Sequence, residues 1–214
     1  MGIVKCRIAV SLDGYAAGPN QSDEEPLGEG GEQLHDWAVE LDAWREGHGR
    51  EGGVTNPSSD VMREATANVG AGVMGRKMFG GGPGPWDEDP AWEGWWGEEP
   101  PFHVPVQVLT HHPREPLEMK GGTTFHFATD GIERAVARAK EDAGDSDVEI
   151  YGGASTIQQT LNAGLLDELL IHVVPILLRG GEPLLANLDE SVRLELIEAV
   201  PAPGVTHLKH RVVR

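Results

Sequence analysis

The 214 residues carry a formal net charge of −18, with 39% hydrophobic and 24% charged residues. A chain this acidic repels phosphate backbones, which argues against a nucleic-acid partner, and no run of about 18 apolar residues supports a membrane span. The single cysteine cannot form an internal disulfide, so we expect a cytoplasmic protein, folded as a single domain over residues 1–214.

The first third of the chain predicts one strand followed by helices. Apolar residues alternate over 3–10, which favours a strand, and a glycine- and acid-rich loop follows at 18–32. One predicted helix face is then made by Leu34, Trp37, Ala38 and Leu41. After a polar stretch at 46–53, Asn56 is expected to cap a second helix with Pro57 in its first turn. The face of that helix is expected to comprise Val61, Ala65 and Val69.

Strands and helices alternate in the middle of the chain. Strands are predicted at 71–74, 104–109, 123–128 and 148–151. The segment 80–101 is rich in Gly, Pro, Trp and acidic residues without a period, so it predicts a loop. Asp130 is expected to cap a helix that ends at Gly144. Its core face is expected to comprise Ile132, Val136 and Ala139, and a short helix should follow the fourth strand over 155–162.

The last third predicts strands alone. The continuous apolar run at 169–174 favours a central strand that is buried on both faces, and 192–200 with 205–213 predicts a closing antiparallel pair. Alternating strands and helices followed by strands alone indicate an α/β fold. Its sheet should be mostly parallel with an antiparallel C-terminal edge.

Two of the predicted strands end in residues suited to an anion. The strand at 148–151 runs into Gly152, Gly153, Ala154, Ser155 and Thr156. Glycines there let the backbone approach a ligand, and a helix start offers N–H groups. The strand at 71–74 ends at Gly75, followed by Arg76, which can fork onto a phosphate, and Lys77. Taken alone, each could also be an ordinary tight or solvated turn.

The strand at 104–109 ends in Thr110, His111 and His112. A phosphate or ribose contact is expected here, although a plain surface turn has the same residues. Neighbouring residues in a strand point to opposite faces, and no further ligand follows at a metal-binding spacing. We therefore expect no metal site.

Together and in this order, these segments resemble the dihydrofolate reductase family, in the branch that includes the C-terminal reductase domain of the riboflavin-biosynthesis protein RibD. Residues 8–15 resemble that branch's first strand and substrate-side turn, 73–77 its Gly-Arg motif, 108–110 the strand beside the adenosine phosphate, and 150–154 its Gly-Gly turn. The resemblance covers nearly the whole chain. It implies a dihydrofolate reductase-like, three-layer α/β/α fold and a homodimer.

The resemblance further implies an NADPH-dependent reductase that transfers a hydride to a small heterocyclic substrate, pterin- or aminouracil-like. It places Val10, Leu12 and Gly14 beside the nicotinamide. It places the adenosine side at Gly75, Arg76, Lys77, Thr110 and His111, and the pyrophosphate at Gly152, Gly153, Ala154, Ser155 and Thr156. The Gly152–Gly153 peptide is expected to be cis.

Several alternatives remain open from the sequence. Asp13 and Asp36 are the candidate catalytic acids. Asp13-Gly14 is also a standard turn pair, and Asp36 could be a solvated helix position. Water could supply the proton in place of either carboxyl. One alternative function is the aminouracil-phosphoribose reductase of riboflavin biosynthesis, with Arg45 and Arg50 as the candidate phosphate ligands; another is a non-catalytic nucleotide-binding dimer. The tryptophans of 80–101 could form a lid over a flat ring, anchor the loop to the core or bury a dimer contact.

Overall fold

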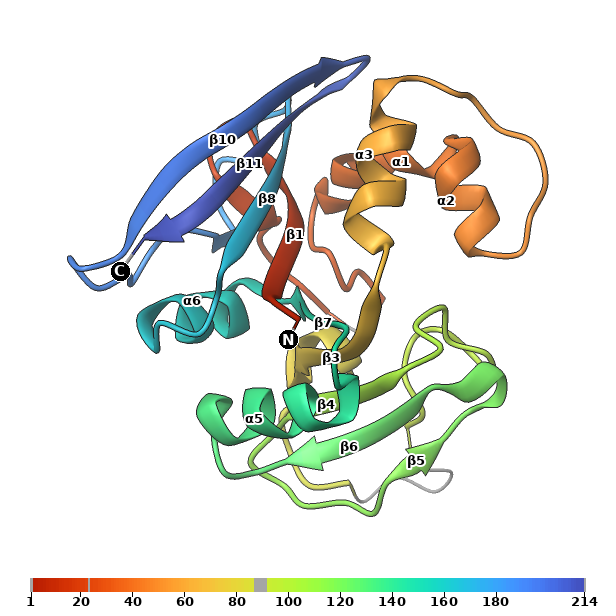
Figure 1. Ribbon diagram of the computed structural model, residues 1–214, viewed down its shortest axis with the longest axis vertical. Coiled ribbons are helices and arrows are strands. Elements are labelled where there is room, and N and C mark those ends of the chain that lie inside the picture. Colours follow the sequence, from red (N-terminus) through yellow and green to blue (C-terminus); the bar gives the residue numbers. More distant parts are fainter. Residues whose placement is uncertain (1, 23, 87–91, 214) are drawn as a thin grey trace. The chain divides into compact units, whose positions relative to one another are not determined.

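The computed structural model describes residues 2–22, 24–86 and 92–213 (Figure 1). The chain divides into two compact units. The first contains the start of the chain up to Cys6 and Asn68–Leu166, and the second contains Arg7–Ala67 and the chain from Asp167 onward. Within the described ranges, every helix is too short or too polar to cross a bilayer.

The first unit is built on a sheet of strand order β1-β7-β3-β4-β6-β5. Its strands are β1 (Val4–Ser11, of which the first three residues belong to this unit), β3 (Val69–Gly75), β4 (Pro105–Leu109), β5 (Leu117–Glu118), β6 (Thr124–Ala128) and β7 (Asp147–Gly152). The pairs are parallel, except that β5 runs antiparallel to β6. The predicted parallel strands are therefore confirmed, and the short β5 was not foreseen.

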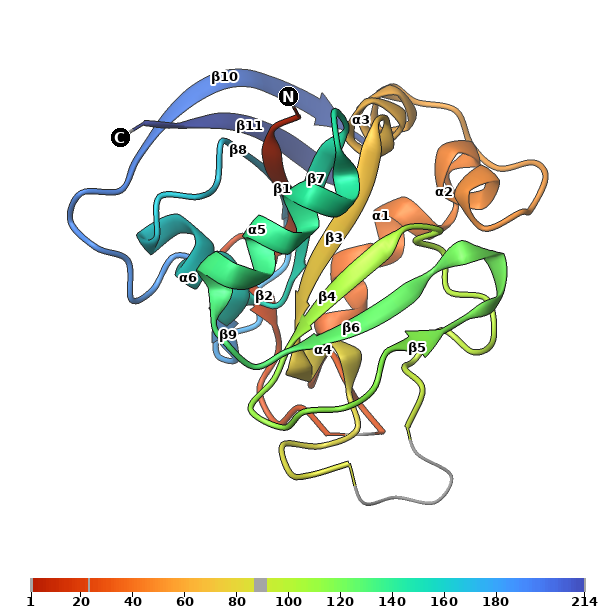
Figure 2. The ribbon, with the colours of Figure 1, turned by 60° about the horizontal axis from the view of Figure 1, so that its bottom comes forward.

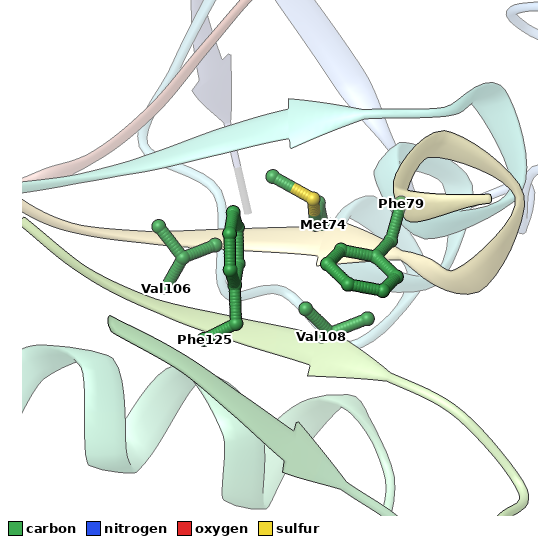
Figure 3. Close-up of a cluster of buried hydrophobic side chains, with 5 residues drawn as sticks. All are labelled: Met74, Phe79, Val106, Val108 and Phe125. Atoms are coloured by element: carbon green, nitrogen blue, oxygen red, sulfur yellow. The ribbon is translucent and has the colours of Figure 1, made fainter. Parts of the chain in front are cut away.

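Different side chains cover the two faces of this sheet. Helix α5 (Ile132–Ala143) packs against β3, β4 and β7 and buries Ile132, Val136 and Ala139, as predicted (Figure 2). A cluster of fully buried side chains forms a second part of the core, shown in Figure 3: Met74, Phe79, Val106, Val108 and Phe125. Since side chains alternate along β4, Gln107 points to the side of α5, where it bonds Asp142 at 3.2 Å.

The start of α5 differs from the prediction. Its N-cap is Gly131, with φ of 92° and no side-chain cap bond, whereas Asp130 was expected to cap it. The Asp130 carboxylate instead receives a forked pair of hydrogen bonds from Arg138, at 2.8 and 2.7 Å. The guanidinium forms two charge-assisted bonds with this carboxylate, whereas a cap would form one with a backbone N–H, which explains the choice. Gly144 ends the helix, as predicted, with φ of 60°.

The tryptophan-rich segment packs on the core of the first unit. The ring of Trp86 meets Phe79 and Phe127 edge-on, at 5.7 and 4.9 Å between centroids. Trp92 Nε1 donates to the Phe79 carbonyl at 2.8 Å, and Trp96 packs against Phe102. Of the sequence alternatives, the structure thus shows anchoring to the core for these side chains.

The second unit holds an antiparallel edge. Its sheet has the order β10-β11-β8-β1, with β8 (Glu168–Val174), β10 (Arg193–Ala202) and β11 (Val205–Val213), and β11 is antiparallel to both β8 and β10. A separate pair joins β2 (Tyr15–Ala17) and β9 (Glu182–Pro183). The predicted antiparallel C-terminal edge is confirmed. Burial on both faces of β8 is also confirmed, because Leu169 and Ile171 are buried on one face and His172 and Val174 on the other.

The helices of the second unit are shorter than predicted. The apolar residues Leu34, Ala38 and Leu41 are buried, but they do not share one helix. Leu34 lies in a 3₁₀ turn, η1 (Gly31–His35), Ala38 lies in α1 (Asp36–Val39), and Leu41 precedes α2 (Asp42–Gly47). Helix α2 enters the stretch expected to be polar loop.

Helix α3 (Pro57–Thr66) begins as predicted, since the Asn56 side chain accepts from the Ser58 N–H at 2.8 Å. Its buried face is Ser58, Ser59 and Met62, not the predicted Val61 and Ala65, and the predicted Val69 lies in β3 instead. Both serine hydroxyls have partners, Ser58 with His207 and Ser59 with Asp42, so their burial leaves no hydroxyl unsatisfied.

Candidate functional site

Three parallel strands of the first unit end side by side. In the sheet register Gly75 of β3 lies opposite Leu109 of β4, and Met74 lies opposite Gly152 of β7. The predicted anion-binding segments 75–77, 110–111 and 152–156 therefore follow the carboxyl ends of neighbouring strands. Ligands of open α/β sheets bind at this edge.

The Gly-Gly turn connects β7 to helix α6 (Ala154–Asn162). The Gly152–Gly153 peptide is cis, as predicted, and Gly152 has φ of 122°, a region that favours glycine. The first hydrogen bonds of the helix run from the N–H groups of Thr156 and Ile157 to the Gly153 carbonyl, at 3.0 and 3.2 Å. The N–H groups of Ala154 and Ser155 precede these bonds, so they lie where a helix start receives an anion.

Gly75 and Gly153 have different surroundings. A Cβ on Gly75 would lie 2.5 Å from Thr156 Oγ1 and 3.7 Å from the Gly152 carbonyl oxygen, so β3 and α6 approach closely at this glycine. A Cβ on Gly153 would have no atom within 4 Å. Thr156 is buried and Ser155 is exposed, so Ser155 presents the accessible hydroxyl of the turn.

Arg76 begins the short helix α4 (Arg76–Phe79) and turns toward the tryptophan-rich segment. Its guanidinium carbon lies 3.1 Å from the centroid of the Trp86 ring, and its Nη2 donates to the Gly81 carbonyl at 2.6 Å. Lys77 is exposed beside it. Stacking on an indole is a cation–π contact that fixes a guanidinium in place.

Trp86 also reaches the end of β4. Its Nε1 donates to the His112 carbonyl at 2.9 Å, and the His112 N–H in turn donates to Thr110 Oγ1 at 3.1 Å. Thr110 is buried and His111 is exposed. Trp86 thus links two of the three strand ends. The sequence offered only the excess of tryptophan in 80–101 as a signal for this link.

The predicted site residues of the second unit lie around the end of β1. Val10 is buried, Leu12 is 65% exposed, and Gly14 has φ of 89°. Asp13 accepts a hydrogen bond from the Ser11 hydroxyl at 2.6 Å, which lowers the pKa of its carboxyl. A lowered pKa keeps Asp13 ionised, which does not suit a proton donor.

The other candidate acid, Asp36, is an exposed residue at the start of α1. The catalytic role of Asp36 stays a prediction. Within the described ranges, His, Cys, Asp and Glu side chains form no group of three that could hold a metal ion.

Comparison with known proteins gives the family. A stretch of 71 residues is 34% identical to the uncharacterized protein YyaP of Bacillus subtilis (strain 168); it spans 33% of this chain and 37% of that protein. The fold is similar to that of a putative riboflavin biosynthesis protein from Shewanella sp. PV-4, over 99% of both chains, at 24% identity and a TM-score of 0.61. It is also similar to dihydrofolate reductase from Enterococcus faecalis complexed with NADP(H) and RAB-propyl, over 100% of this chain and 98% of that one, at 15% identity and a TM-score of 0.54.

These likenesses confirm the predicted dihydrofolate reductase-like fold. The model of the RibD C-terminal domain matches residues 3–208, which is nearly the whole chain. The protein therefore belongs to the RibD C-terminal domain family.

Proposed function

We propose that the protein is an NADPH-dependent reductase that transfers a hydride to a small heterocyclic substrate, pterin- or aminouracil-like. The observation that carries the proposal is the open space at Gly153, beside the first-turn N–H groups of Ala154 and Ser155. A pyrophosphate needs this combination, because it must approach the backbone closely and receive N–H donors.

The residues of the first unit fit the phosphate-bearing part of the cofactor. The N–H groups of Ala154 and Ser155, with the exposed Ser155 hydroxyl, would hold the pyrophosphate. Arg76, held over Trp86, would meet the additional phosphate of NADPH, with Lys77, Thr110 and His111 around it. NADPH supplies the hydride when it is bound. For Val10, Leu12 and Gly14 of the second unit, a place beside the nicotinamide stays a prediction.

The substrate must also receive a proton. The lowered pKa of Asp13 argues against that carboxyl as the proton donor, so Asp36 or water is the proposed source of the proton.

Arg45 donates its Nε to the Glu51 carbonyl at 3.0 Å, and the Arg50 guanidinium lies 5.9 Å from the Trp44 ring. Both arginines thus contact residues of α2 and the stretch directly after it, which does not favour the phosphoribosyl substrate of the alternative function. We propose a homodimer, as the family resemblance implies, and a cytoplasmic location, in line with the single cysteine.

Thermal unfolding with NADPH and with NADH tests the proposal. Binding at a hundredfold excess over Kd stabilises a folded protein by about 2.7 kcal/mol, so NADPH should raise the Tm clearly and more than NADH. Absence of a shift with either nucleotide would overturn the proposed function. A shift without NADPH oxidation across pterin, aminouracil and quinone substrates would favour the non-catalytic nucleotide-binding dimer.

A further inference from the structure

The turn after β1 is tied to the segment that follows β8 within the second unit. The Leu12 N–H donates to the Ile176 carbonyl at 2.9 Å. On the other side of the turn, the Leu184 N–H donates to the Gly14 carbonyl at 3.0 Å. The turn is therefore held by backbone bonds at both of its ends.

The Asp13 carboxylate makes a third tie between the same two segments. Its Oδ1 accepts from the Ser11 hydroxyl at 2.6 Å and from the Leu178 N–H at 3.1 Å, and its Oδ2 accepts from the Arg179 N–H at 2.7 Å. Hydrogen bonds from N–H groups to a carboxylate are stronger than neutral ones. Arg179 has φ of 60°, a left-handed conformation that is uncommon outside glycine and is held here by the bond to Asp13.

Two large apolar side chains are presented by the segments that Asp13 joins. Leu12, which donates the backbone bond to Ile176, is 65% exposed, and Leu177, which follows Ile176, is 56% exposed. Single exposed leucines are ordinary on a protein surface. A pair on two segments tied by a carboxylate forms a fixed apolar edge, which suits contact with a flat, apolar ring.

We propose that Asp13 is a positioning residue, which ties the turn after β1 to residues 178–179 so that Leu12 and Leu177 face the ring of the ligand. Asp13 is then not the proton donor of the reaction. The contact with a ligand rests on the proposed reductase function, whereas the tie itself does not.

Limited trypsin digestion tests the tie without any ligand. Arg179 is exposed, so the rate at which trypsin cuts after Arg179 reports how firmly the segment is held. Asp13→Ala should speed this cleavage about tenfold, given the strength of charge-assisted bonds, and Asp13→Asn, which keeps one acceptor oxygen, should fall between. The control Asp60→Asn, on an exposed position of α3, should cleave like the unmodified protein. Equal rates for Asp13→Ala and the unmodified protein would overturn the proposal.

Steady-state NADPH oxidation tests the role of the tie in catalysis. If Asp13 is a positioning residue, Asp13→Ala should raise the KM about tenfold, and Asp13→Asn should recover most of that loss. The pH profile of kcat should keep its shape in both variants. If Asp13 were the proton donor, Asp13→Asn would be as inactive as Asp13→Ala and one limb of the profile would vanish. If the unmodified protein does not oxidise NADPH, the reductase function fails, and the trypsin rates still decide whether Asp13 ties the segments.

Discussion

The Nδ1 atoms of His172 and His207 lie 2.7 Å apart inside the second unit. The two residues sit opposite each other on β8 and β11 and are 4% and 1% exposed. A hydrogen bond between two nitrogens needs one donor and one acceptor, so only one of these Nδ1 atoms carries a proton. The Nε2 atom of His207 lies 2.8 Å from the Ser58 hydroxyl, and the Trp37 ring packs against both imidazoles.

This pair makes the protein sensitive to acid. Burial lowers the pKa of His172, and the positive charges of His207, Arg7 and His35 lower it further; burial lowers the pKa of His207 to about 4. The unfolded chain keeps the ordinary histidine pKa near 6.5. The unfolded state therefore binds more protons below that value, and stability that is fully present above pH 6.5 is lost as the pH falls toward 4.

We expect the protonation of His207 to lower the free energy of unfolding by about 2 kcal/mol between about pH 7.5 and about pH 5. Protonation of His172 should add a loss of the same sign. Urea denaturation at the two pH values measures it. His207→Gln should flatten the dependence, and His111→Gln, at an exposed position, should leave it unchanged. A pH dependence of full size in His207→Gln would contradict this account.

The strand and helix alternation could be predicted because local patterns decide it. The Gly-Gly turn, the Asn56 cap and the apolar face of α5 each depend on residues close together in the chain. The Asp130 cap failed because Arg138, two turns further along, competes for the carboxylate. The same limit applies to helix α3, where the buried serines are explained only by partners on other elements.

The site shows the same division between local and distant residues. The three strand ends were recognisable from their glycines and cations, and the register of β3, β4 and β7 brings them together. The contacts of Trp86 with Arg76 and His112 join residues across a loop without periodicity, so no sequence pattern indicates them. Likewise, the bonds of Asp13 to Leu178 and Arg179 cross most of the chain.

Two glycine substitutions separate binding from stability at the Gly-Gly turn. Gly153 has φ of −72° and free space around its Cβ position, so Gly153→Ala should change the free energy of unfolding by no more than about 0.5 kcal/mol. Its methyl group would occupy the proposed pyrophosphate position and raise the Kd for NADPH at least about tenfold.

Gly75→Ala should instead cost about 1–3 kcal/mol of stability, because Thr156 Oγ1 lies 2.5 Å from the new Cβ. Urea unfolding and NADPH titration of both variants give the comparison. Unchanged affinity in Gly153→Ala would place the pyrophosphate elsewhere.

Substitutions of Arg76 test whether the first unit binds NADPH in preference to NADH. The Nε and Nη1 atoms of Arg76 are buried beside Trp86, so the guanidinium must turn outward to offer its fork of N–H groups to the additional phosphate of NADPH. Arg76→Ala should therefore weaken NADPH about tenfold more than NADH, and Arg76→Lys, which keeps a point charge but loses the fork, should give an intermediate ratio. Arg134→Ala removes the same charge from an exposed position on α5 and should change the Kd of the two nucleotides equally.

Parallel titrations of the three variants with both nucleotides measure the ratio of the Kd for NADPH to the Kd for NADH. An equal loss for NADPH and NADH in Arg76→Ala, together with a lower Tm, would instead assign Arg76 to holding the 81–86 segment through Gly81 and Trp86.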